Sequence, residues 1–281
     1  MKRMTALSFV GVFFIFCNST VIAGDVVDEG VSELSVGAEL FRWQEFNRAG
    51  TRLLTEQGVR NRLSFSRNNE MRSSSGMLYR VSGSMYVGTV DYDGQTQPVD
   101  RSTPKELTGY YAASSVDYSG VVGELTGGYR IAGFKWGRAL DLLVGVGVDS
   151  WSRDIGNGTS SQGKTVGGYE EDYEIVFSRF SLGMEKKTPI WRSLWRAGIL
   201  YPISTDEKVD GLALNLKLKP GREPSAFFSY RFQLADSGGK AGLYAKFVYD
   251  SYRFSKSAVV SGFEQPKSDM DMVSLSIGRV F

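Results

Sequence analysis

The feature that most constrains this chain is a long-range alternation of apolar and polar residues. In the stretch ALDLLVGVGVDSW, one face carries Leu140, Leu142, Val144, Val146 and Val148, and the other carries Asp141, Gly145, Gly147 and Asp149. Successive side chains point to opposite faces in a β-strand, so the pattern predicts strands whose two faces meet different surroundings. The composition agrees, because 33 glycines, 17 phenylalanines, 14 tyrosines and only 7 prolines suit unbroken β-ladders.

Four other segments repeat this alternation. Their apolar faces comprise Tyr79, Val81, Met85 and Val87, then Leu125, Tyr129 and Ile131, then Ala226, Phe228, Tyr230, Phe232 and Leu234, and lastly Leu243, Ala245, Phe247 and Tyr249. The segments run for roughly 10 to 15 residues, whereas soluble strands usually have about 5 to 6. Since about 9 to 11 tilted residues cross a bilayer, the alternation indicates membrane-spanning strands.

Ten such strands are expected, over residues 33–46, 57–68, 76–91, 115–131, 137–151, 170–186, 190–203, 224–235, 241–255 and 269–281. Short turns alternate with long polar loops at about 92–114, 152–169, 204–223 and 256–268. Lipid tolerates no open sheet edge, so the fold class is all-β, a closed antiparallel up-and-down transmembrane β-barrel. A soluble periplasmic β-sandwich is the alternative fold, because sandwich strands also alternate.

Two segments depart from the simple scheme. In YEIVFSRFSLGM, the apolar register that holds Tyr173, Ile175 and Phe177 gives way to one that holds Phe180 and Leu182, which predicts a β-bulge. Residues 212–219, LALNLKLK, alternate well enough for an eleventh strand. We interpret them as part of a hairpin above the membrane, with a twelve-stranded barrel as the alternative.

The N-terminus has the layout of a secretory signal peptide. Lys2 and Arg3 precede an apolar run from Ala6 to Cys17, which is too short to span a membrane, and small residues then lead to Ala23. We expect cleavage after Ala23. This divides the chain into a signal peptide, residues 1–23, and a barrel domain, residues 24–281.

The last residues, DMDMVSLSIGRVF, place Val273, Leu275, Ile277 and Phe281 at alternate positions, interrupted by Arg279. This resembles the C-terminal strand of outer-membrane β-barrel proteins of Gram-negative bacteria. The resemblance implies location in the bacterial outer membrane, contact with its lipid and lipopolysaccharide, and recognition of the terminal strand by the barrel assembly machinery. Arg279 stands where that pattern usually has an apolar residue, and its long side chain can reach the membrane interface.

The polar faces of the strands should line the lumen. Candidates for a lumenal charge network are Arg80, Glu124, Arg130, Asp141, Asp149, Arg231, Lys246 and Asp250. Their balance in sign favours a paired network that fills the lumen over a selective pore. Gly145 and Gly147 should make room for large neighbours such as Tyr86 or Arg130, and Trp136, Trp191, Trp195 and Tyr201 should belong to the interfacial girdle.

The chain contains no histidine. Outer-membrane barrel enzymes such as the phospholipase, the lipid A deacylases and the omptin proteases rely on histidine, so we expect no enzymatic activity. No cofactor or metal site is expected either. The acidic cluster Glu170, Glu171 and Asp172 is interpreted as a solvated rim or a site touching lipopolysaccharide-bound cations.

Net charge is +2, from 33 basic and 31 acidic residues, and does not favour nucleic acid as a partner. We expect a monomer with a plugged lumen and a structural or surface-interaction role, carried by the long external loops. A narrow channel for ions or small solutes is the alternative. A histidine-free enzyme that uses lumenal carboxylates is a third, weaker hypothesis.

Overall fold

The computed structural model describes residues 30–70, 73–95, 111–134, 138–210, 216–234 and 242–281, so the expected signal peptide lies outside the described residues. Ten long strands form the described wall: β1 (Val31–Phe46), β2 (Arg52–Asn68), β3 (Gly76–Gln95), β4 (Tyr111–Phe134), β5 (Arg138–Ile155), β8 (Tyr169–Lys187), β9 (Trp191–Asp210), β11 (Ser225–Leu234), β12 (Gly242–Phe254) and β13 (Lys267–Val280). Each pairs antiparallel with its neighbours, and β1 pairs with β13 to close the barrel. The predicted fold class and the count of ten strands are confirmed. No helix in the described ranges could span a membrane.

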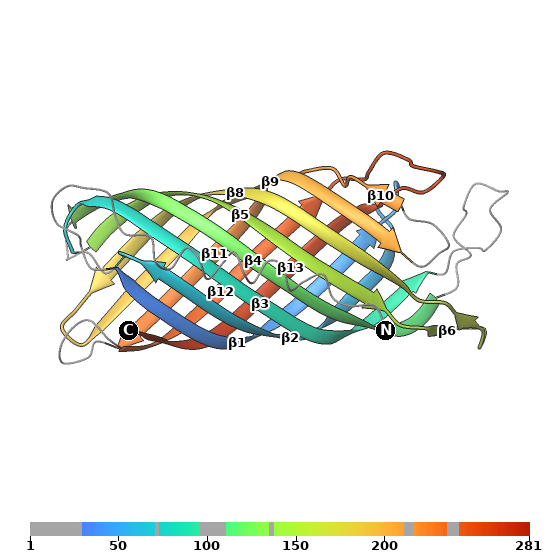
Figure 1. Cartoon of the computed structure of the whole chain (residues 1–281), viewed down its shortest axis with the longest axis horizontal. Helices are drawn as coiled ribbons and strands as arrows, with labels where there is room; N and C mark the ends of the chain where they lie inside the picture. The colour runs from blue at the N-terminus through green and yellow to red at the C-terminus, as the bar shows by residue number, and fades with distance from the viewer. Residues whose placement is uncertain (1–29, 71–72, 96–110, 135–137, 211–215, 235–241) are drawn as a thin grey trace.

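The two ends of the barrel differ in their connections. At one end, here named the short-turn end, Glu33 at the start of β1 pairs with Val280 near the C-terminus. The opposite, long-loop end carries three additional short strands, β6 (Gly158–Ser160), β7 (Thr165–Val166) and β10 (Leu216–Leu218), and β6 and β10 are labelled there in Figure 1. β10 pairs with β9 alone, at residues 207–209. Of the predicted segment 212–219, residues 212–215 lie outside the described residues, and the part that is described pairs outside the ten-stranded wall, as expected. The twelve-stranded alternative is wrong.

At the long-loop end, the connection between β1 and β2 is a short turn, which the side chain of Asn47 holds. Its side-chain oxygen accepts hydrogen bonds from the backbone nitrogens of Ala49 (2.9 Å) and Thr51 (2.8 Å). Gly50 adopts a φ of 78°, which an L-residue with a side chain rarely takes. An asparagine followed by this glycine thus specifies a tight turn between β1 and β2.

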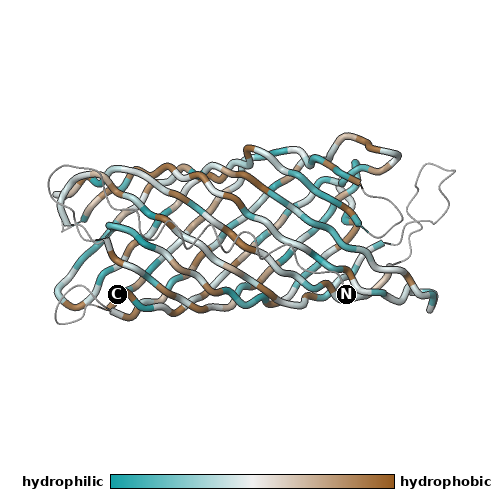
Figure 2. The backbone as a smooth tube through the Cα atoms, in the orientation of Figure 1, coloured by the Kyte–Doolittle hydropathy of each residue, from teal (hydrophilic) through white to brown (hydrophobic). Residues whose placement is uncertain are grey.

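A belt of exposed apolar side chains surrounds the half of the barrel nearer the short-turn end. Leu40 is 62% exposed and Ile277 is 65% exposed, and the belt continues around the wall through Leu63, Val87, Leu125, Val144, Leu182, Ile199, Phe232 and Phe247. So much contiguous apolar surface is stable only when it contacts lipid. Figure 2 shows hydrophobic and hydrophilic residues alternating along the tilted strands.

Beyond this belt, toward the long-loop end, the pattern reverses. Outward positions become polar, as at Gln57, Asp154 and Glu170, while inward positions become aromatic and aliphatic. This section has the polarity of a soluble barrel, with its apolar residues inside. Several strands therefore extend beyond their predicted ranges: β3 reaches Gln95 where the prediction ends at 91, and β4 begins at Tyr111 where the prediction begins at 115.

The reversal accounts for the irregular segment in β8. Tyr173 and Phe177 face the lumen above the belt, whereas Phe180 faces outward within it, so β8 itself needs no extra residue. The bulge lies on β9, and the prediction that placed it on β8 is wrong. Val176 pairs with Ser204 and Phe177 with Pro202, which leaves Ile203 as the additional residue on β9.

Candidate functional site

A layer of ion pairs lies across the lumen at the short-turn end. Arg130 and Asp141 are fully buried, and Nε and Nη2 of the arginine donate to the two carboxylate oxygens at 2.7 and 2.8 Å. Glu185 binds Nη1 of Arg130 at 2.5 Å and Nε of Arg192 at 2.6 Å. Every charge in this part of the layer has an oppositely charged neighbour, which offsets the cost of removing it from water.

Glu70, from the connection between β2 and β3, completes this layer. Its carboxylate contacts Nη2 of Arg196 at 2.7 Å and Nη1 of Arg80 at 3.1 Å, and its carbonyl oxygen accepts hydrogen bonds from Arg130 and Arg192. Glu70 therefore joins arginines from three strands, β3, β4 and β9, at the barrel end. We name this set the ionic layer, and it consists of Glu33, Glu70, Arg80, Arg130, Asp141, Glu185, Arg192, Arg196 and Arg231.

A cluster of buried apolar side chains occupies the lumen toward the long-loop end. All ten long strands contribute to it, and its members are Phe41, Trp43, Leu54, Tyr86, Val90, Val116, Tyr118, Trp151, Ile155, Tyr173, Ile175, Phe177, Leu200, Phe227, Tyr252, Phe254, Met270 and Met272. We name this set the aromatic plug. Trp151 stacks on Tyr173 with ring centroids 5.0 Å apart, and Trp43 meets the same tyrosine edge-on at 5.6 Å. Rings packed in this way fill much of the lumen at this level.

Arg60 links the plug to the polar part of the lumen. Its guanidinium lies 4.0 Å from the centre of the Phe41 ring and 4.2 Å from that of Tyr86, and it forms a buried ion pair with Glu39. The planar cation can stack on aromatic faces while donating to a carboxylate, a combination that lysine offers less well. Arg60 thus covers the face of the plug that borders the polar part of the lumen, and its own charge is paired with Glu39.

Arg153 lies in the part of the plug nearer the long-loop end, among three buried carboxylates. It donates from Nε to Glu171 at 2.6 Å and from Nη1 to Glu56 at 3.0 Å, and Nη2 lies 3.3 Å from Glu45. Burial raises the pKa of Glu56 to about 7, against the opposing effect of Arg153. Burial also raises the pKa of Glu171 and that of the neighbouring Glu207. One cation faces several carboxyl groups here, so protonation of some of them favours the folded barrel.

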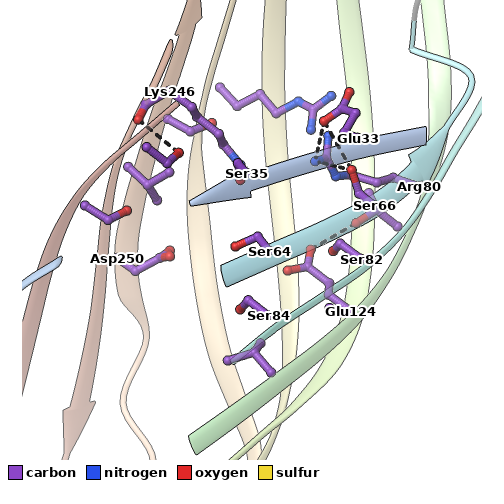
Figure 3. A pocket seen from close by; sticks show the side chains of 18 of the residues that line it. Glu33, Ser35, Ser64, Ser66, Arg80, Ser82, Ser84, Glu124, Lys246 and Asp250 are labelled. Atoms are coloured by element: carbon purple, nitrogen blue, oxygen red, sulfur yellow. Dashed lines mark hydrogen bonds and ion pairs between the residues drawn. The ribbon is translucent and has the colours of Figure 1, made fainter. Parts of the chain in front are cut away.

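Between the ionic layer and the aromatic plug lies a polar cavity of about 170 Å³. Its charged lining consists of Glu33, Arg62, Arg80, Glu124, Arg179, Arg196, Lys246 and Asp250. Serines supply much of the rest, and Figure 3 shows Ser64, Ser82 and Ser84 across the cavity from Lys246 and Asp250. A polar space of this size holds several water molecules.

The eight predicted lumenal residues all face the interior, but they divide among these parts. Arg80, Arg130, Asp141 and Arg231 belong to the ionic layer. Glu124, Lys246 and Asp250 line the cavity, where Arg179 lies 3.0 Å from Asp250 and 3.5 Å from Glu124. Asp149 lies at the plug and accepts hydrogen bonds from the hydroxyls of Tyr86 (3.0 Å) and Tyr252 (3.2 Å).

Sequence reasoning missed a larger set of lumenal charges. They are Glu33, Glu39, Glu45, Glu56, Arg60, Arg62, Glu70, Arg153, Glu171, Arg179, Glu185, Arg192, Arg196 and Glu207. Most of them stand at alternate positions within expected strands, so the same two-residue period could have identified them. Glu70 could not be found in this way, because it lies in a turn.

Two details of the predicted interior are wrong. The glycines do make room for other side chains, but the neighbours differ from Tyr86 and Arg130. A Cβ on Gly147 would lie 2.5 Å from Cζ of Phe177, and a Cβ on Gly145 would lie 2.8 Å from Oε1 of Glu124. The acidic cluster does not form one solvated rim. Glu171 is buried beside Arg153, because the strand period places it on the opposite face from Glu170 and Asp172.

The predicted membrane-facing residues lie on the outer wall where the structure describes them. Trp195 and Tyr201 are partly exposed, Trp191 stacks on Phe232, and Trp136 lies outside the described residues. Leu275 and Ile277 on β13 and Phe281 just after it are exposed, and the guanidinium of Arg279 lies 5.5 Å from the centre of the Phe281 ring. Within the described ranges, no group of acidic, histidine or cysteine side chains could hold a metal ion.

Neither a family model nor a curated protein matches this chain. Among solved structures it is similar to the outer membrane protease OmpT of Escherichia coli, with a TM-score of 0.57 at 10% identity over 92% of this chain and 98% of that one. The translocator domain of the autotransporter NalP from Neisseria meningitidis matches at a TM-score of 0.42 and 9% identity, over 98% of this chain and 95% of that one. The fold is thus that of an integral outer-membrane β-barrel, as expected.

Proposed function

We propose that this protein is a non-enzymatic barrel of the bacterial outer membrane with a closed lumen, acting through the loops at its long-loop end. The observation that carries this proposal is the presence of two packed layers of side chains in the lumen. The ionic layer and the aromatic plug lie on opposite sides of the polar cavity, and each draws side chains from strands around the barrel. A solute would have to displace both to cross.

Planar-bilayer recording of refolded, heat-modifiable protein tests the closure. The wild-type barrel should give no conductance steps. Trp151→Ala should also be silent, because the ionic layer still spans the lumen after the plug is loosened. Reproducible steps from the wild-type protein would contradict the proposal.

A narrow channel for ions or small solutes is the second candidate, and the polar cavity favours it. If it is correct, Lys246→Gln and Asp141→Asn should shift the ion selectivity of the recorded steps, because both side chains face the lumen. Folded protein that stays silent at several voltages would exclude this candidate.

We propose that the chain lacks catalytic activity, although OmpT is a protease. The likeness at 10% identity bears on the fold, and this chain has no histidine to act as a general base. Incubation of the folded barrel with a mixed peptide library, followed by mass spectrometry, tests this. Cleavage by wild-type protein that is lost in Glu56→Gln would establish a histidine-free peptidase instead.

The surface role rests on the geometry of the long-loop end, where β6, β7 and β10 extend past the barrel wall. The predicted loop at 92–114 lies mostly outside the described residues. Replacing the charged side chains Lys256 and Glu264, which are 3.9 Å apart in the connection to β13, should reduce adhesion of cells that display the barrel. Unchanged adhesion, with unchanged surface display, would contradict a role for this loop.

The remaining proposed partners are outer-membrane lipid, lipopolysaccharide and the barrel assembly machinery, with the protein acting as a monomer. The exposed apolar residues of β13 support recognition of that strand. Leu275→Ser combined with Ile277→Ser should lower the heat-modifiable fraction formed in assembly-competent membranes more than Val144→Ser combined with Val146→Ser. Equal losses in the two variants would show that lipid contact alone accounts for the effect.

A further inference from the structure

We infer that the polar cavity inside the barrel is a binding site for one small monovalent anion of about the size of chloride, held by Lys246. The inference starts from the charge balance of the lining. The carboxylates that line the cavity are all engaged by arginines, because Glu33 binds Arg80 and Arg231, while Glu124 and Asp250 both contact Arg179.

The lining arginines are engaged in turn. Arg62 binds Glu39 at 2.6 Å, and Arg196 binds Glu70 at 2.7 Å. Lys246 is the exception, since its ammonium has no hydrogen-bond or ion-pair partner among the described residues. When protonated, Lys246 adds one positive charge to a lining whose other charged groups each contact a group of opposite charge.

The surroundings of Lys246 favour an anion over water alone. Lys246 is only partly exposed, and an unpaired ammonium in such a place is costly unless an anion or the loss of its proton neutralises it. The lining is rich in donors, with serine hydroxyls on several strands and buried Nε–H groups of Arg62 and Arg196 that find no acceptor in the described part of the chain. The cavity lining carries five basic and three acidic side chains, so it favours an anion, and about 170 Å³ accommodates one monovalent anion with part of its hydration shell.

The side chains on the two walls of the cavity determine how the anion would be held. Figure 3 places Lys246 beside Asp250 on one wall, with Glu124 and the serines of β2 and β3 on the other. Carboxylates at both walls disfavour a second anion or a dianion by like-charge repulsion. The site needs no open path through the barrel, so it stands whether or not the lumen conducts.

Chloride-35 NMR line broadening of the folded barrel, in zwitterionic detergent with gluconate as the balancing anion, tests the inference. Wild-type protein should show saturable excess broadening that bromide competes away. Lys246→Gln should weaken this binding at least about tenfold, since a charged hydrogen-bond partner is lost. Lys246→Arg should retain saturable binding. Lys217→Gln is the matched control, because Lys217 is exposed on β10, and it should behave as wild type.

Linear, unsaturable broadening of the wild-type protein would overturn the inference, as would equal binding by Lys246→Gln and Lys217→Gln. If Lys246→Gln does not fold, as judged by heat modifiability, bromide-soaked crystals of the wild-type protein decide the question. An anomalous peak in the cavity beside Nζ of Lys246 would support the site, and a cavity that holds only water would overturn it.

Discussion

Arg130 and Asp141 lie directly opposite each other on β4 and β5 and form a two-pronged ion pair that solvent does not reach. Arg130 also contacts Glu185 and the carbonyl oxygen of Glu70, so the pair anchors the whole ionic layer. A buried pair of this kind contributes little net stability when intact. Its loss is costly, because the remaining arginine stays buried with less compensation.

The first prediction concerns this pair. Asp141→Asn keeps the shape of the side chain and removes its charge, so it should lower the free energy of unfolding by about 3 to 5 kcal/mol. Asp154→Asn, on the outer surface of the same strand, should stay within about 0.5 kcal/mol of wild type. Urea unfolding in lipid vesicles, followed by tryptophan fluorescence, measures both. Equal stabilities of the two variants would show that Arg130 does not depend on Asp141.

A second prediction tests the packing of the aromatic plug. A Cβ on Gly147 would lie 2.5 Å from Cζ of Phe177 and 2.6 Å from the carbonyl oxygen of Gly123, so Gly147→Ala should destabilise the barrel by about 1 to 3 kcal/mol. A Cβ on Gly127, on β4, meets no atom within 4 Å, which makes Gly127→Ala the matched control. Thermal loss of the fast-migrating folded form on gels should occur at a lower temperature for Gly147→Ala alone. Matching temperatures for the two variants would mean that Phe177 moves aside freely.

How much of this barrel the sequence could predict depends on which solvent each section faces. Within the belt, lipid outside and a polar lumen inside impose a strict two-residue period, so Leu142 and Asp141 could be assigned to opposite faces correctly. Above the belt the period persists but its sense reverses. Tyr173 and Phe177 are apolar and inward there, and alternation alone does not state where lipid ends.

The interior contacts were less predictable for a different reason. A strand period tells which side chains enter the lumen, but pairing depends on register and on turns. Glu70 reaches Arg196 and Arg80 from a connection with no periodic pattern. The two-residue period places Lys246 in the lumen. Its lack of a partner among the described residues depends on where the neighbouring arginines and carboxylates lie, which the period does not specify.

A third prediction concerns like charges on the outer surface above the belt. Asp154 lies opposite Glu170 across β5 and β8, and Glu170 lies opposite Asp210 across β8 and β9. Directly opposed like charges destabilise a sheet, so Glu170→Lys should raise the free energy of unfolding by about 0.5 kcal/mol at low salt. Urea unfolding at low and high ionic strength measures the effect. The gain should vanish in about 1 M salt, because the ions screen charges more than about 3 Å apart. A gain that persists there would contradict the electrostatic explanation.

The last prediction uses the raised pKa of Glu56, which lies above the belt beside Arg153. The folded barrel holds the Glu56 proton with a pKa of about 7, against 4.5 for the free side chain, because burial disfavours the carboxylate. The folded state therefore binds more protons than the unfolded chain between these values. This stabilisation is complete below about pH 4.5 and is lost as the pH rises through about 7. The loss amounts to about 3 kcal/mol, in proportion to the shift.

Glu56→Gln isolates this contribution, because the amide cannot titrate. Urea unfolding between pH 4.5 and pH 8 should show a shallower decline in stability for Glu56→Gln than for wild type. Some decline should remain, since burial also raises the pKa of Glu171 and Glu207. Glu170→Gln, with its side chain on the outer wall, should keep the wild-type profile. If Glu56→Gln and wild type decline in parallel, the proton that stabilises the plug resides on another carboxyl group beside Arg153.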